Sequence, residues 1–118
     1  MSCMLYLVSD SVRLGFVSPD LAIAQMKMLQ QTFNIYRELK EQGKLKFVYA
    51  FADSPGGILV LDVASNEELQ QTLFMLPSMP LVDRTVRPLT EIRSVEGLIA
   101  ELESIVSSMP RGAAQEKP

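Results

Sequence analysis

The segment KLKFVYAFADSPGGILVLDV, residues 44–63, decides the predicted fold because it contains two apolar runs joined by a short turn. The first run alternates bulky residues with small or charged ones, which is typical of a strand with one bulky face. Residues 54–57, SPGG, are typical of a turn. The apolar run after them predicts a second strand. The short connection makes the pair an antiparallel hairpin. The bulky face of the first strand is expected to carry Leu45, Phe47, Tyr49 and Phe51.

Upstream of this hairpin, the sequence predicts a buried strand and then a long helix. Met4–Val8 is a continuous apolar run, as in a strand that is covered on both faces. Ser18 is a good N-cap, Pro19 fits the first helical position, and Gly43 supplies a C-terminal stop. Side chains between these signals recur at spacings of three and four, which places them on one helix face. That face is expected to carry Met26, Leu29, Phe33, Tyr36 and Lys40.

Downstream of the hairpin, residues 62–83 predict a second helix that leads into a final strand. Ser65 as N-cap and Glu68 three residues later form a capping box. This structural role explains Glu68 and its neighbour Glu67 better than a pair of catalytic carboxylates does. The final strand, PLVDRTVRPL, contains Pro88, which cannot donate a hydrogen bond to a neighbouring strand. The sequence therefore places this strand at the edge of a sheet.

The predicted order of elements is strand, helix, strand, strand, helix, strand, which is the pattern of a ferredoxin-like α+β sandwich. In that fold the first and third strands are central, and these are the most uniformly apolar strands here. Residues 1–92 are expected to form this domain. A C-terminal helix is expected over residues 93–108, and residues 109–118 are expected to form a flexible tail.

The second face of the predicted sheet is expected to be covered by another copy of the chain. Two helices cover only one face of a four-stranded sheet, and neither face of the hairpin is fully polar. An apolar face of this size is normally covered. A second copy would give a two-fold dimer with a barrel-like core. The alternative is that the C-terminal helix folds back over this face.

Composition excludes several classes of function. The net charge is −3 without a cluster of lysines or arginines, so nucleic acid is not an expected partner. With no histidine and a single cysteine, zinc sites and histidine-dependent triads are excluded, and neither a metal nor a cofactor is expected. The longest apolar run is far below a membrane span, and the N-terminus does not have the pattern of a signal peptide. Cys3 is most simply a reduced thiol in a cytoplasmic protein.

The stretch DVASNEELQQTL followed by LPSMPLVDRTVRPL resembles the muconolactone isomerase family, as does the opening strand MLYLV. The resemblance covers roughly Met4 to Leu89. It implies a dimeric α+β barrel that can assemble further. It also implies an isomerase of bacterial aromatic catabolism, which shifts a double bond in a small carboxylated lactone. Such a reaction needs a base for a C–H proton, a donor for the developing oxyanion and a cation for the substrate carboxylate.

Candidate site residues follow from these chemical requirements. A carboxylate at a strand end could face a pocket and act as the base, and tyrosines and an arginine could bind the substrate. For Asp62, a structural role as a buried carboxylate that holds a corner of the fold is favoured over the role of catalytic base. Arg84 and Arg87 are expected to point to opposite faces of their strand, so at most one enters a given pocket. The predicted catalytic residues are Asp62 and Asp83, and the predicted substrate-binding residues are Tyr6, Tyr36, Tyr49 and Arg84.

Two other functions remain open at the level of sequence. A cofactor-free monooxygenase of the wider dimeric barrel class would use the same fold for different chemistry. A non-enzymatic module that binds a small molecule would use the same pocket without turnover.

Overall fold

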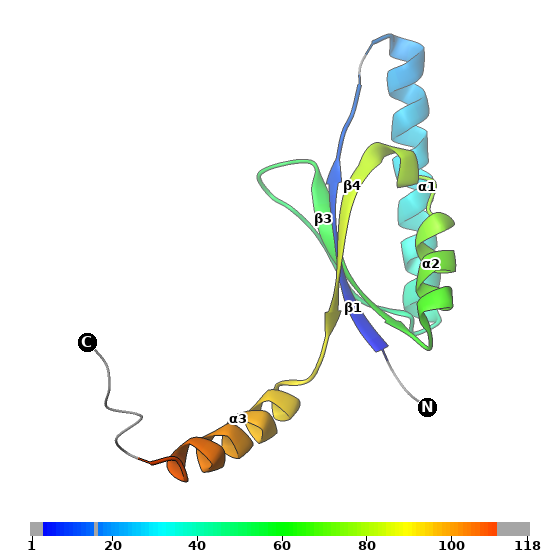
Figure 1. Ribbon diagram of the computed structural model, residues 1–118. Helices are drawn as coiled ribbons and strands as arrows, with labels where there is room; N and C mark the ends of the chain where they lie inside the picture. The colour runs from blue at the N-terminus through cyan, green and yellow to red at the C-terminus, as the bar shows by residue number, and fades with distance from the viewer. Residues whose placement is uncertain (1–3, 16, 111–118) are drawn as a thin grey trace, which may run out of the picture.

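Four antiparallel strands form a single sheet in the order β2-β3-β1-β4. They are β1 (Met4–Val12), β2 (Leu45–Ala50), β3 (Gly56–Val63) and β4 (Val82–Leu89). The computed structural model describes residues 4–15 and 17–110. Helices α1 (Pro19–Glu41) and α2 (Asn66–Phe74) lie on one face of the sheet (Figure 1). The predicted ferredoxin-like α+β fold is confirmed, with the first and third strands in the centre.

Local capping explains where the two helices begin and end. The Ser18 hydroxyl accepts a hydrogen bond from the Leu21 amide at 3.2 Å, and Gly43 adopts a left-handed φ of 79° just after α1. The Ser65 hydroxyl accepts from the Glu68 amide at 3.1 Å. The Glu68 carboxylate accepts in return from the Ala64 amide at 2.7 Å. The capping box predicted at the start of α2 is therefore confirmed.

The core lies between the sheet and the two helices. Alternate residues of β1 and β3 point into this layer, and β2 and α2 add leucines to it. The short 3-10 helix η1 (Met79–Leu81) connects α2 to the edge strand β4. The largest apolar side chains that are almost fully buried are Leu45, Leu61, Leu76 and Val8.

The buried face of α1 is more polar than the sequence predicted. The spacing predicts one face with Leu29, Phe33, Tyr36 and Lys40, and these four residues do line the space between α1 and the sheet, whereas Met26, predicted on the same face, is 50% exposed. Gln25 and Thr32 are buried instead. They are buried because each satisfies a backbone amide of a neighbouring loop. The Gln25 side chain accepts from Gly15 at 3.1 Å, and the Thr32 hydroxyl accepts from Ser78 at 2.9 Å.

We expect Thr32→Val to destabilise the protein by about 1–3 kcal/mol, since it leaves the buried Ser78 amide without an acceptor. Thr32 is 1% exposed, so water cannot replace the hydroxyl without rearrangement. Urea unfolding followed by circular dichroism measures the change. Thr72→Val on α2 is the matched control and should change stability by no more than about 0.5 kcal/mol. Equal losses in both variants would contradict the proposed role of this contact.

A β-bulge divides the aromatic strand β2 between the two faces of the sheet. The pairing with β3 shifts between Leu45 and Phe47. Leu45 pairs with the buried Leu61 and is 2% exposed, whereas Phe47 and Tyr49 are 57% and 64% exposed. The prediction that these side chains share one face is therefore wrong. The extra residue in the bulge reverses the alternation beyond it.

The sheet face away from α1 and α2 is largely apolar. The register of the strands places alternate residues of all four strands on it. Helix α3 (Ile92–Ser107) follows β4 and lies apart from this face (Figure 1). Within the described part of the chain, every helix is too short or too polar to span a bilayer. The apolar side chains of this open face are Leu5, Leu7, Phe47, Tyr49, Ile58, Val60 and Leu89.

Candidate functional site

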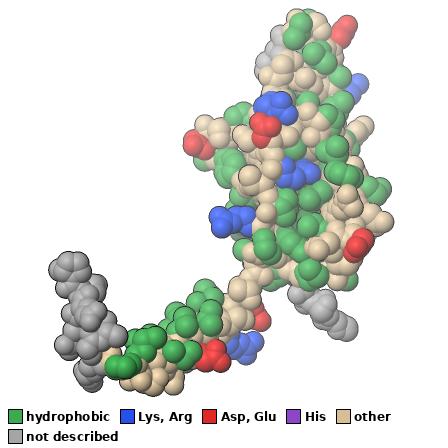
Figure 2. Space-filling view, in the orientation of Figure 1, with side chains coloured by type: hydrophobic (Ala, Val, Ile, Leu, Met, Phe, Trp, Pro, Cys, Tyr) green, Lys and Arg blue, Asp and Glu red, His purple; other side chains and the backbone are tan. Residues whose placement is uncertain are grey.

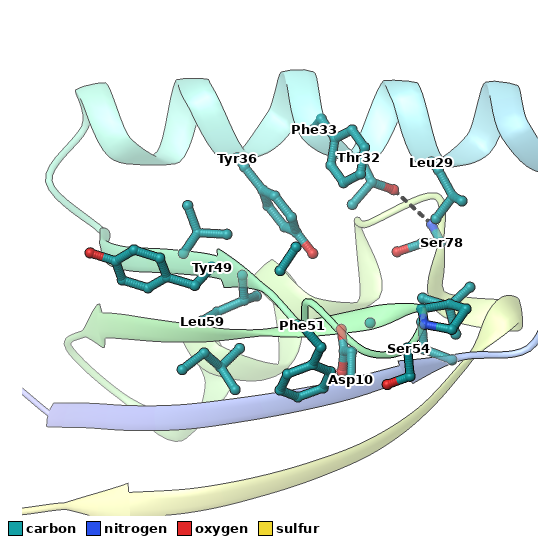
Figure 3. Close-up of a pocket in the computed structure, with 18 of the residues that line it drawn as sticks. Asp10, Leu29, Thr32, Phe33, Tyr36, Tyr49, Phe51, Ser54, Leu59 and Ser78 are labelled. Carbon is teal, nitrogen blue, oxygen red and sulfur yellow. Dashed lines mark hydrogen bonds between the residues drawn. The ribbon is translucent and has the colours of Figure 1, made fainter.

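A cavity of about 580 Å³ lies between α1 and the sheet. Its walls come from α1, from the ends of β1 and β3 that meet at the hairpin, and from β2 (Figure 3). Most of the lining is apolar, and Phe33, Val48 and Leu59 are among its members. The polar groups that reach it include Asp10, Tyr36 and Lys40. A mostly apolar pocket with a few polar groups is the usual form of a small-molecule site.

A buried ion pair forms the floor of this region. Asp10 on β1 lies opposite Arg84 on β4 in the register of the sheet. The Arg84 Nε and Nη2 atoms donate to the two carboxylate oxygens of Asp10 at 2.7 and 2.9 Å. Their side chains are 8% exposed for Asp10 and 14% for Arg84. This two-point contact fixes the orientation of the carboxylate and compensates its charge in the buried site.

Tyr36 extends from α1 toward the sheet, with its hydroxyl on the side of Asp10 (Figure 3). Burial raises the pKa of Tyr36 to about 12, and the negative charge of Asp10 adds to the rise while Arg84 opposes it. The phenol therefore keeps its proton throughout the neutral range. A neutral phenol in an apolar cavity is a hydrogen-bond donor, as an oxyanion requires.

The raised pKa of Tyr36 predicts a loss of stability at alkaline pH. An unfolded tyrosine ionises near pH 10.0, whereas folded Tyr36 holds its proton up to about pH 12. Between these values the unfolded state binds fewer protons, so the free energy of unfolding falls as pH rises. Below pH 10 both states are protonated, and the contribution is constant. Urea unfolding at pH 9 to 12 should show a steeper decline for the native chain than for Tyr36→Phe; parallel declines would refute the assignment.

Cationic side chains occur at the rim of the cavity. Arg37 and Lys40 line it from the last turns of α1, and both are exposed. The guanidinium of Arg37 donates to Asn34 at 2.6 Å. Lys40 stands at the end of the helix, where its charge complements the helix dipole. Arg37 or Lys40 could therefore bind the carboxylate of a ligand at the rim of the cavity rather than in its buried interior.

The two carboxylates predicted as catalytic, Asp62 and Asp83, lie outside this cavity. Asp62 is on the open face of the sheet, where its carboxylate is 3.7 Å from Lys46 Nζ. It lines a second hollow of about 550 Å³ on that face, together with Phe47 and Val60. Asp83 is exposed on β4 and pairs with Arg13 at 3.1 Å. The structure does not bring the two aspartates together, and their catalytic role stays a prediction.

The predicted substrate-binding residues are dispersed. Tyr36 lines the cavity, and Arg84 reaches it through Asp10. Tyr6 is buried in the core, where its hydroxyl donates to Asn66 at 2.5 Å. Tyr49 lines the edge of the cavity, although its pairing with Ile58 places it on the open face of the sheet. Of the four predicted substrate-binding residues, only Tyr36 and Arg84 lie next to the carboxylate of Asp10.

Asp10 is the central polar residue that the sequence prediction missed. The alternation of Tyr6, Val8 and Asp10 along β1 places all three on the buried face. That alternation was the available signal, but the polar run Ser9–Ser11 resembles the end of a strand. Within residues 4–15 and 17–110, the structure contains no group of three or more Asp, Glu, Cys or His side chains that could bind a metal ion.

Comparisons with known proteins agree with this fold. The sequence model of the muconolactone delta-isomerase family matches residues 4–94. The chain belongs to the muconolactone delta-isomerase family. The muconolactone delta-isomerase of Acinetobacter baylyi is 32% identical over 77 residues, which are 65% of this chain and 78% of that protein. The resemblance expected from the sequence is thereby confirmed.

A solved member of the muconolactone isomerase family has the same fold. The crystal structure of muconolactone isomerase matches with a TM-score of 0.66 and 27% identity. The match covers 75% of this chain and 90% of that one. Because the family match ends at residue 94, nearly all of α3 lies beyond it.

Proposed function

We propose that the protein is an isomerase of the muconolactone delta-isomerase type. It would shift a double bond in a small carboxylated lactone by moving one proton. The observation that supports this most directly is the cavity, which contains the carboxylate of Asp10, held by Arg84, and the neutral phenol of Tyr36. The match to a family of isomerases agrees with it. A volume of about 580 Å³ is in the range of small-molecule sites. The apolar lining strengthens electrostatic contacts with the charge that develops during the reaction.

In this proposal Asp10 is the base. Its carboxylate removes the acidic C–H proton that is conjugated with the lactone carbonyl through the double bond, the electrons delocalise into a dienolate, and the same proton returns two carbons away, next to the carbonyl. Substrate and product are isomers, so no oxidant or reductant is needed. Arg84 occupies one lone pair on each oxygen of Asp10 and leaves others to accept the proton. Arg84 is thus a positioning residue that holds the base in place.

Tyr36 and Lys40 have distinct roles in this proposal. Tyr36 donates a hydrogen bond to the carbonyl oxygen as it becomes an enolate, and its raised pKa keeps the proton available. Lys40 at the rim binds the carboxylate of the substrate. The three groups approach from two layers, with Asp10 on the sheet and the other two on α1. The distance between these layers sets the space for the lactone ring.

Self-association as a two-fold dimer is part of the proposal. The open face of the sheet exposes Leu5, Leu7, Ile58 and Val60 in part and Phe47 strongly. Contact between two such faces would bury these side chains and form the closed barrel implied by the family resemblance. Asp62 would then lie inside the interface, beside Lys46.

Conversion of muconolactone by the purified full-length protein tests the proposed activity. We expect proton NMR to show the alkene signals of muconolactone replaced by those of its double-bond isomer, together with a new CH₂ signal at the carbon that receives the proton, with no change in mass. Boiled protein is the control for spontaneous isomerisation. Absence of conversion by folded protein at a concentration close to that of the lactone would overturn the proposal.

A further inference from the structure

Helix α3 carries a broad apolar stripe that no part of the chain among residues 4–15 and 17–110 covers. Side chains along α3 and just after it recur at spacings of three and four and occupy one side of the helix. Each of them is between 40% and 72% exposed. Polar residues, among them Glu96, Glu101 and Glu103, occupy the other side. The stripe consists of Ile92, Val95, Leu98, Ile99, Leu102, Ile105, Val106 and Met109.

The helix stands away from the body of the protein. Figure 1 shows α3 projecting from the end of β4 to the side of the sheet opposite α1 and α2. In Figure 2 its hydrophobic side chains gather along one edge, next to open space. The radius of gyration is 21.0 Å, whereas a compact domain of this length has about 13 Å. A protein of this composition does not leave so large an apolar surface in water without a partner.

The helix also needs packing for its own stability. It has 16 residues and contains Gly97 in its interior. An isolated helix of this length is marginal in water, and an interior glycine weakens it further. We therefore expect the apolar stripe of α3 to pack against another protein surface in the folded state.

The described part of its own chain offers α3 no suitable surface. The helical layer of α1 and α2 lies on the opposite side of the sheet (Figure 1). The open face of the sheet is on the correct side, but the proposed dimer fills that face with the sheet of the second copy. The tether between β4 and α3 is only Thr90–Glu91, so α3 cannot pass around the sheet edge to its own helices. A helix of 16 residues is about 24 Å long and extends well into the space of a stacked second sheet, which lies about 10 Å away.

We propose that α3 is an arm that packs its apolar stripe on a second copy of this chain, reciprocally across the two-fold axis. The inference rests on the proposed dimer and adds to it a contact made by residues beyond the family match. Each copy gives one helix and receives one. Stable interfaces bury about 1,600 Å² in total, and the two helices would add their apolar stripes to the area that the two sheet faces bury. The arm adds a helix contact between the copies to the contact between their two sheets.

Mixed isotope labelling tests this arm directly. Full-length chains with ¹³C methyl groups are unfolded and refolded with an equal amount of unlabelled chains, and isotope-filtered NOEs then report only contacts between copies. We expect such NOEs from methyl groups of Leu98 and Leu102 on α3, and separately from Val60 on the open sheet face. Val60 signals without α3 signals would overturn the arm and leave the dimer intact. Absence of both sets would overturn the dimer and the arm together.

A pair of variants measures the contribution of the arm. Leu102 is at the centre of the stripe, and Ala100 lies on the polar side of the same helix. Leu102→Glu should raise the dissociation constant of the dimer at least tenfold in sedimentation equilibrium, whereas Ala100→Glu should change it less than threefold. Equal dissociation constants for the two variants would contradict the proposal.

Discussion

Arg84→Ala is expected to destabilise the protein by about 3–5 kcal/mol, because it leaves the carboxylate of Asp10 buried without its partner. This loss is a large part of the stability of a domain of this size. Chemical denaturation at pH 7 measures it.

Two further variants separate the ion pair from general effects of losing an arginine. Arg93→Ala removes an arginine whose side chain is 83% exposed on α3, and we expect a change within about 0.5 kcal/mol. The double variant Asp10→Leu with Arg84→Met removes both charges and should recover most of the stability lost in Arg84→Ala. If Arg84→Ala and Arg93→Ala lower the free energy of unfolding equally, the Asp10–Arg84 pair does not have the role assigned to it.

Tyr36→Phe is expected to lower kcat for the proposed isomerisation about 100-fold, because it removes the donor to the developing oxyanion. The effect on KM should be small, since the hydrogen bond strengthens only as charge develops on the carbonyl oxygen. Initial rates over a range of lactone concentrations give both constants.

A control for Tyr36→Phe removes a hydroxyl group elsewhere. Thr72→Val does so on α2, at a position that does not line the cavity, and should leave kcat unchanged. Circular dichroism of Tyr36→Phe should match that of the native chain, because the ring stays in place. An unchanged kcat in Tyr36→Phe would remove the phenol from the proposed mechanism.

The order of elements could be predicted from the sequence because its signals are local. Ser18 and Ser65 cap helices through residues three positions away, and Gly43 ends α1 with its own backbone conformation. The placement of Pro88 at an edge strand follows from its missing donor. Each of these signals acts within one turn of the chain, so no knowledge of the tertiary structure is needed.

The polar interior could not be predicted in the same way because its partners are distant in sequence. Asp10 is compatible with a buried strand only because Arg84, 74 residues later, neutralises it. Thr32 belongs to the core because of the Ser78 amide, 46 residues later. The bulge in β2 likewise depends on its pairing with β3. In the sequence, Asp62 and Asp83 are the more conspicuous candidates, because each is an isolated carboxylate that follows an apolar run.

A crystal structure with an unreactive saturated analogue of the lactone tests the central claim most directly. We predict that the analogue lies in the cavity between α1 and the sheet, with its carbonyl oxygen within hydrogen-bond distance of the Tyr36 hydroxyl and its ring next to Asp10. Binding in the hollow lined by Asp62 on the open sheet face, with the α1 cavity empty, would contradict this assignment of the active site.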